Sequence, residues 1–118
     1  MKYEVTITNI GDFSLQLLKL RESMILFDRD VPYEYVDMVV AHTKDAVRGL
    51  IEVGGTVLIA DHEYTITAIG SDALNTLKEH GHCTLLFNGK DTVEQTGQIA
   101  MSGKGIPRVL VGDTICFV

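Results

Sequence analysis

Short runs of alternating apolar and polar residues dominate the chain. Tyr3–Ile10 places apolar side chains at every second position from Tyr3 to Ile7, which is the period of a strand with one buried face. Thr56–Ala60 and Tyr64–Ile69 flank a polar turn, so they predict a hairpin. Four more runs predict strands: Met24–Phe27, Cys83–Phe87, Thr92–Met101 and Thr114–Val118.

Two segments depart from this pattern. Ser71–His80 predicts a helix, with Ser71 as its N-cap and Gly81 as the residue that ends it. Ser14–Arg21 is rich in leucine and fits either a helical turn or an irregular apolar strand. The many short strands predict a mainly β fold, a small antiparallel barrel or sandwich with one short helix at about residues 71–80.

The segment Tyr33–Thr43 is ambiguous, because its spacing tolerates a helix while its β-branched valines favour a strand. We predict a strand over Met38–Thr43. Alternate residues of a strand point to opposite faces, so His42 and Lys44 share one face. If the other face points into the barrel, His42 is exposed, and its side chain is not expected to support the core.

Length and composition bound the broad class. A chain of 118 residues predicts a single domain, 1–118. No apolar run approaches the roughly 20 residues that a membrane-spanning helix needs. The segment Met1–Val5 begins like a strand and lacks an apolar signal core, so we expect a cytoplasmic protein. In that reducing compartment, Cys83 and Cys116 are expected to be buried free thiols.

The charge balance points away from nucleic acid. The net charge is −6, and the lysines and arginines are scattered without a basic stripe. Two interpretations of the acidic surface stay open: it steers the chain towards a basic patch on a protein partner, or it only maintains solubility.

The candidate chemistry rests on four histidines, His42, His62, His80 and His82. His80 and His82 lie two residues apart beside Cys83, but no further Cys/His cluster completes four ligands, so we expect no metal. His80 is expected to be a solvated cation at a helix end, and His62 an exposed residue of a hairpin turn. No Walker-type loop occurs, and no cofactor is expected.

One stretch is specific enough to carry a family resemblance. Thr67–Phe87, which reads TAIGSDALNTLKEHGHCTLLF, resembles the glucitol/sorbitol-specific IIA component of the bacterial sugar phosphotransferase system. Weaker similarities extend over nearly the whole chain, at Tyr3–Gly11, Met24–Phe27 and Val39–His42 among others. The sequence departs from the family at Lys44, where the family pattern has a second histidine.

The resemblance implies a barrel and a phosphoryl carrier. It implies that His42 is the phosphorylated residue, and His82 is the candidate for orienting it or for contacting the phosphoryl group. Lys44 offers a cation, and Thr43 a hydroxyl or backbone donor, for the new charge. The expected partners are the histidine-containing phosphocarrier protein and the membrane-bound IIB and IIC permease components.

Two other hypotheses come from different classes. The chain is alternatively a non-catalytic binding or regulatory barrel that has lost phosphoryl transfer, a hypothesis that the departure at Lys44 favours. A third possibility is a small metal-binding β-domain.

Overall fold

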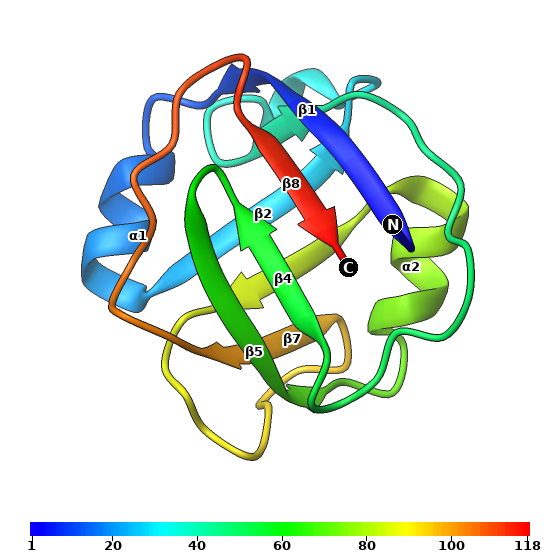
Figure 1. The fold of residues 1–118 in the computed structure, drawn as a ribbon. Helices are drawn as coiled ribbons and strands as arrows, with labels where there is room; N and C mark the ends of the chain where they lie inside the picture. Colours follow the sequence, from blue (N-terminus) through cyan, green and yellow to red (C-terminus); the bar gives the residue numbers. More distant parts are fainter.

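Eight strands close into a barrel in the computed structural model, which describes residues 1–118. The strands follow the order β1-β3-β2-β6-β7-β5-β4-β8 around the barrel, and β8 pairs with β1, which closes it (Figure 1). Their bounds are β1 Tyr3–Ile10, β2 Ser23–Asp28, β3 Val40–His42, β4 Thr56–Ile59, β5 His62–Ile69, β6 Cys83–Leu86, β7 Gln98–Ser102 and β8 Thr114–Phe117.

The barrel is not fully antiparallel, which corrects one expectation from the sequence. β2 pairs with β3, and β6 with β7, in parallel, whereas the other six pairs are antiparallel. The loops 29–39 and 87–97 carry the chain back to the end of the barrel at which the preceding strand began. A long connection is what a parallel pair requires, since a tight turn joins only antiparallel strands.

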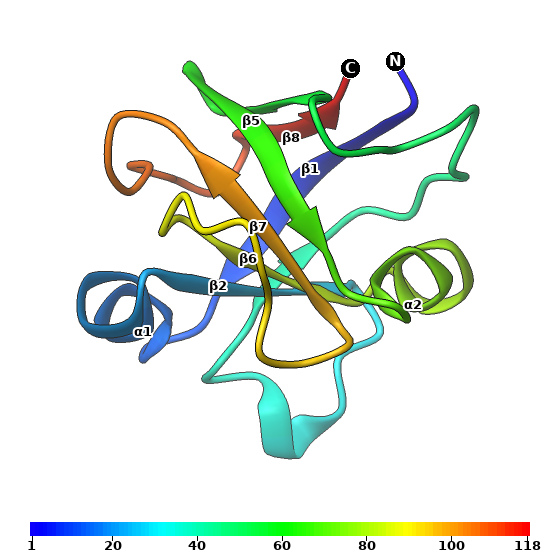
Figure 2. The same cartoon turned by 90° about the horizontal axis from the view of Figure 1, so that it is seen from below.

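The structure has two α-helices where the sequence predicted one. α1 spans Ser14–Arg21 and α2 spans Ala73–His80, and a short 3-10 helix, η1, covers Tyr33–Tyr35. The helices lie on opposite sides of the barrel with β2 running between them (Figure 2). Neither is long and apolar enough to cross a membrane.

Each helix contributes a leucine to the barrel core. Leu18 of α1 and Leu77 of α2 are buried in the main apolar cluster, and the ambiguous leucine-rich segment is therefore a helix that packs Leu18 against the core. The predicted cap at Ser71 is wrong, because Asp72 precedes the helix and makes no side-chain capping bond. Gly81 ends α2 in a left-handed conformation, as predicted.

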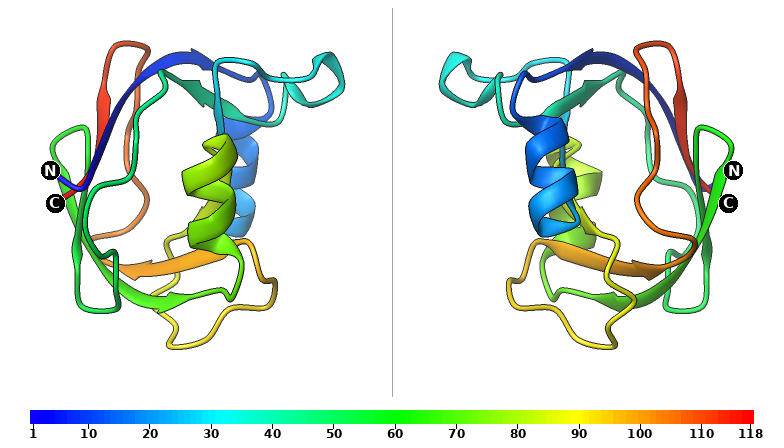
Figure 3. Two further views of the ribbon diagram at one scale, coloured as in Figure 1. Left: turned by 90° about the vertical axis from the view of Figure 1, so that its right-hand side faces the viewer. Right: turned by 90° about the vertical axis from the view of Figure 1, so that its left-hand side faces the viewer.

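The barrel interior is filled by inward-facing side chains from all eight strands. The predicted inner face of β1 is confirmed, since Tyr3, Val5 and Ile7 are all buried. Figure 3 shows the strands surrounding this interior, with the two termini beside each other at one edge. The termini meet there because Tyr3 of β1 pairs with Phe117 of β8.

Two predicted strands are shorter than expected. The strand predicted at Met38–Thr43 is limited to Val40–His42, and the one predicted at Thr92–Met101 is limited to Gln98–Ser102. In both segments the earlier residues belong to the long loops that make the parallel crossovers. The extent of these strands is therefore set by the available partners, which alternation along the chain does not reveal.

Gly70 offers a test of the backbone packing beneath α2. A Cβ at this position would lie 2.3 Å from the carbonyl oxygen of Thr96 and 2.6 Å from its carbonyl carbon. We expect Gly70→Ala to destabilise the fold by about 1–3 kcal/mol, because backbone cannot move aside as a flexible side chain does. Gly97→Ala is the matched control, since a Cβ there meets nothing within 4 Å. Urea denaturation measures the free energy of unfolding of both variants, and equal values for Gly70→Ala and Gly97→Ala would contradict the packing argument.

The cysteines give a second test. Both are buried free thiols, and burial raises the pKa of Cys83 to about 12 and that of Cys116 above its usual value. Since the thiolate is the reactive form, we expect a disulfide reagent at neutral pH to modify Cys83 only when the chain unfolds. Rapid labelling of Cys83 in the folded protein, measured against urea-unfolded protein, would contradict this placement.

Candidate functional site

His42 lies inside the barrel wall, which corrects the prediction that it is exposed. His42 is the last residue of β3, and it is 0% exposed to solvent. Val40, two residues earlier on the same face, belongs to the main core cluster. The inward face of β3 is therefore the Val40–His42 face, the opposite of the assignment from the sequence, and His42 is part of the packed structure.

Both ring nitrogens of His42 lie within hydrogen-bond distance of backbone carbonyl oxygens. Nδ1 is 2.7 Å from the oxygen of Thr43, and Nε2 is 3.0 Å from the oxygen of Gly81. A neutral imidazole has one N–H and donates to one of them, whereas the imidazolium donates to both. The rings of Tyr3 and His42 pack in a T-shaped arrangement, with centroids 6.3 Å apart.

Thr43 holds the end of β3 against β1. Its N–H donates to the carbonyl of Thr6, and its hydroxyl oxygen accepts from the N–H of Thr6. The group of Thr43 that meets the His42 ring is thus its carbonyl, an acceptor, whereas its hydroxyl accepts from Thr6. This acceptor favours the tautomer with a proton on Nδ1.

Gly81 occupies a position that only glycine fits well. Its φ of +69° is in the left-handed region, and a Cβ would lie 2.9 Å from the Cβ of Asp28 and 3.3 Å from Cε1 of His42. Asp28 is also the register partner of His42 across the parallel pair β2–β3. The end of β2, the end of β3 and the end of α2 thus meet at the imidazole.

A polar pocket of about 140 Å³ opens at this junction. Gly81 lines it together with charged side chains from three segments; the complete lining is Tyr3, Asp28, Lys44, Asp45, Leu77, Lys78, Glu79 and Gly81. The two lysines and three carboxylates give a mixed lining, so the pocket is polar without being strongly cationic.

Lys44 lines the pocket and is already paired with carboxylates. Its Nζ is 2.5 Å from Oδ2 of Asp30 and 4.0 Å from Oδ2 of Asp28. The hydrogen bond to Asp30, and then the charges of both aspartates, raise the pKa of Lys44 above its usual value. Lys44 is therefore a half-exposed cation near His42, but the carboxylates compete for it with any anion in the pocket.

His82 does not hydrogen-bond to His42. Its partly buried ring stacks on Phe27, with centroids 3.8 Å apart and an interplanar angle of 24°. Burial, and secondarily the charge of His80, lowers the pKa of His82. The ring of His80 lies 5.4 Å from that of His82. The closest link between His82 and His42 runs through the backbone, because the Gly81 carbonyl belongs to the Gly81–His82 peptide.

The remaining histidines lie elsewhere. His80 is exposed at the end of α2, near Glu79, as predicted. His62 begins β5, and its Nε2 accepts a long hydrogen bond of 3.4 Å from the N–H of Arg108. No group of three or more His, Cys, Asp or Glu side chains is arranged to hold a metal ion.

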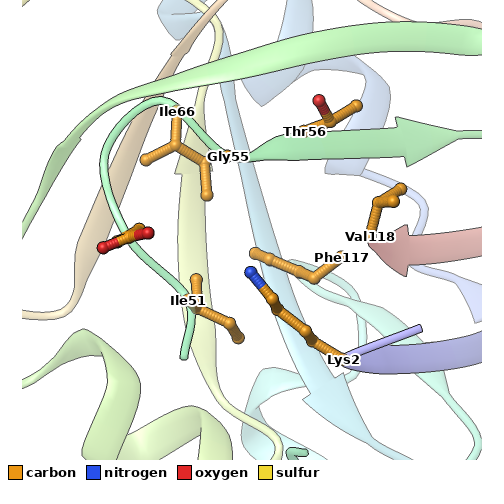
Figure 4. Close-up of a pocket in the computed structure, with 8 residues that line it drawn as sticks. Lys2, Ile51, Gly55, Thr56, Ile66, Phe117 and Val118 are labelled. Carbon is orange, nitrogen blue, oxygen red and sulfur yellow. The ribbon is translucent and has the colours of Figure 1, made fainter. Parts of the chain in front are cut away.

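A second hollow, beside the two chain termini, does not have the chemistry of a site. Figure 4 shows the side chain of Lys2 reaching towards Ile51 and Phe117 in this hollow. It is too narrow to hold a water molecule, and no histidine or cysteine lines it. This hollow therefore lacks the imidazole that His42 supplies at the junction.

Sequence reasoning missed two members of this junction. The sequence predicts Gly81 only as the residue that ends a helix and does not single out Asp28, yet both lie against His42. Asp28 is the first polar residue after a buried apolar run, which is a common place for functional side chains. Only the parallel pairing of β2 with β3 places it opposite His42.

The fold has a close counterpart among solved structures. The crystal structure of a PTS system IIA component from Enterococcus faecalis V583 superposes with a TM-score of 0.85, covering 98% of this chain and 99% of that one. At 21% identity, this similarity establishes the barrel architecture alone.

Sequence comparison extends beyond the fold. The PTS system glucitol/sorbitol-specific EIIA components of Escherichia coli K12 and of Shigella flexneri are each 29% identical to this chain over 115 residues, covering 98% of it and 93% of theirs. The family model for the PTS system glucitol/sorbitol-specific IIA component matches residues 2–116. Because the match spans every strand and both helices up to Cys116, the chain belongs to the family of glucitol/sorbitol-specific IIA components of the phosphotransferase system.

Proposed function

We propose that this chain is a cytoplasmic phosphoryl carrier for hexitol uptake, with His42 as the residue that is phosphorylated. It would accept the phosphoryl group from the histidine-containing phosphocarrier protein and pass it to a cysteine of the IIB component of the permease. Membership of the family supports the general role. The observation that carries the choice of residue is the pair of backbone contacts at the His42 ring.

These contacts assign different tasks to the two ring nitrogens. The shorter contact, from Nδ1 to Thr43, holds a proton on Nδ1 and leaves the lone pair on Nε2. In the forward step Nε2 attacks phosphorus as the bond from phosphorus to the donor imidazole breaks. In the next step the P–Nε2 bond breaks as the acceptor thiolate attacks, and the imidazole of His42 is regenerated.

The same geometry imposes a condition on transfer. The Gly81 carbonyl lies 3.0 Å from Nε2, where the phosphoryl group would have to bind, and the ring has no exposed surface. Transfer therefore requires the Gly81–His82 turn to move away from the ring. The pocket lined by Gly81 and Lys44 is the adjacent space into which the phosphoryl group would enter.

Lys44 is the cation that we expect to stabilise the charge of the phosphoryl group. Phosphoryl transfer depends chiefly on positioning and on charge stabilisation, so a nearby ammonium favours the phosphorylated form. We propose that Lys44 exchanges its contact with Asp30 for one with the phosphoryl oxygens. Thr43 contributes by fixing the tautomer through its carbonyl, and His82 contributes by fixing the turn that bears the Gly81 carbonyl.

A regulatory barrel without transfer activity is the second candidate. The complete burial of His42 and the three carboxylates around the pocket favour it, since both oppose binding of an anion at the ring. Incubation with phosphoenolpyruvate, enzyme I and the phosphocarrier protein separates the two candidates. A chain that takes up no phosphoryl group from competent donors is the regulatory one.

His42 substitution tests the site directly. We expect His42→Gln to abolish uptake of acid-labile, alkali-stable phosphate, as measured by mass spectrometry of the intact chain. His42→Ala should do the same, but it should also destabilise the fold by about 1–3 kcal/mol, because the carbonyl of Thr43 loses its donor. His62→Ala is the control for a distant histidine. Normal uptake by folded His42→Gln would move the assignment to His82.

The ionisation of His82 gives a second test. Because burial lowers the pKa of His82, the ring should be neutral at pH 7 and should titrate in NMR below the value of a free histidine. Protonation is disfavoured in the folded state, so His82 should reduce stability as the pH falls below about 6.5, its unfolded pKa. Phe27→Ala should raise the pKa by exposing the ring. His80→Gln should raise it less, since the His80 charge is the smaller cause; a pKa unchanged by Phe27→Ala would contradict the stacking argument.

A further inference from the structure

One peptide unit connects helix α2 to the imidazole of His42. The carbonyl of the Gly81–His82 peptide faces His42 Nε2 at 3.0 Å. The N–H of the same peptide donates to the carbonyl of Thr76 at 3.2 Å. Since a trans peptide directs its C=O and N–H to opposite sides, the position of the carbonyl at the ring depends on the bond at the other end.

Thr76 holds the next peptide as well. Its hydroxyl Oγ1 lies 2.7 Å from the carbonyl oxygen of His82 and 3.1 Å from that of Ala73. A hydroxyl has one proton, and the shorter distance favours donation to His82. Thr76 thus accepts from the N–H of His82 through its carbonyl and donates to the C=O of His82 through its side chain, which restrains both peptides of that residue.

The restrained turn is also one that can move. Gly81 has no side chain and adopts a left-handed conformation, so its dihedral angles have alternatives open to no other residue type. Gly81 donates its own N–H to Leu77, the usual bond at the end of a helix. The side-chain bond of Thr76 is therefore an addition to ordinary helix termination, and it acts on the residue after the glycine.

We propose that Thr76 is a positioning residue for His42: by clamping His82 it keeps the Gly81 carbonyl on Nε2 and holds the ring closed to electrophiles. The functional importance of this clamp rests on the proposed role of His42 as the phosphorylated residue. In that role, release of the clamp precedes phosphoryl transfer. The chemistry of the clamp itself concerns only access to Nε2.

Diethyl pyrocarbonate measures that access without any partner protein. The unprotonated imidazole nitrogen attacks a carbonyl carbon of the reagent, the C–O bond to ethyl carbonate breaks, and the other ring nitrogen releases its proton to solvent. Peptide mass spectrometry assigns the modification to each histidine, and the exposed His80 serves as an internal reference. In the wild-type chain we expect the reagent to modify His42 slowly relative to His80, because the ring of His42 is fully buried.

Thr76→Val removes the hydroxyl and nearly preserves the shape. We expect it to increase the rate of His42 modification about fivefold, as for loss of one hydrogen bond that holds a closed state. Thr76→Ser restores the hydroxyl and should return the rate to that of the wild type. Thr67→Val is the matched control, since Thr67 lies on β5, which does not pair with β3, and its hydroxyl donates to the carbonyl of Lys90.

Amide exchange separates a local clamp from general loosening. In Thr76→Val the N–H of His82 should exchange faster, while the N–H of Met101 in the barrel core should not. Thr76→Ala is the second variant if valine prevents folding, since alanine has the highest helix propensity. An unchanged rate at His42 in both variants, or an equal increase in Thr67→Val, overturns the proposal.

The outcome is independent of phosphoryl transfer. If folded Thr76→Val opens His42 to the reagent and the wild-type chain takes up no phosphoryl group, the clamp stands and the proposed carrier function fails. If the wild-type chain is phosphorylated on His42 and the variants leave His42 modification unchanged, the carrier function stands and the clamp is wrong.

Discussion

The imidazole of His42 is the bridge on which the geometry of the candidate site depends. It lies between the carbonyl of Thr43, just after β3, and the carbonyl of Gly81, which is 39 residues after His42 in the chain. A buried carbonyl without a donor is costly, and a ring with its proton on Nδ1 supplies that donor to the carbonyl of Thr43. Its position is consequently determined by the barrel rather than by its neighbours in sequence.

Barrel closure brings these groups together. β3 is short and pairs with β1 on one side and β2 on the other, and the parallel register with β2 sets Asp28 opposite His42. β2 also pairs with β6, which follows α2 directly, so the turn at Gly81 is carried to the same edge. A glycine is needed in that turn because a side chain would collide with Asp28.

Burial has opposing consequences for the proposed chemistry. A ring inside the wall is protected from water and held in one tautomer, which favours a defined nucleophile and a phosphoryl group shielded from hydrolysis. The same burial prevents a partner protein from reaching Nε2 while the Gly81 carbonyl is in place. A carrier built in this way depends on a turn that can open, and in the proposed clamp the hydroxyl of Thr76 is the group that must release this turn.

The sequence by itself determined the mainly β class, the inner face of β1, the helix before Gly81 and the identity of the candidate histidines, because alternation and glycine placement are local properties. It did not determine the parallel pairs, the helix at Ser14–Arg21 or which face of β3 points inward. The last of these reversed the environment of His42 from solvent to core. A three-residue strand with apolar residues on both faces has no local signal for its orientation, so only its partners in the closed barrel could decide it.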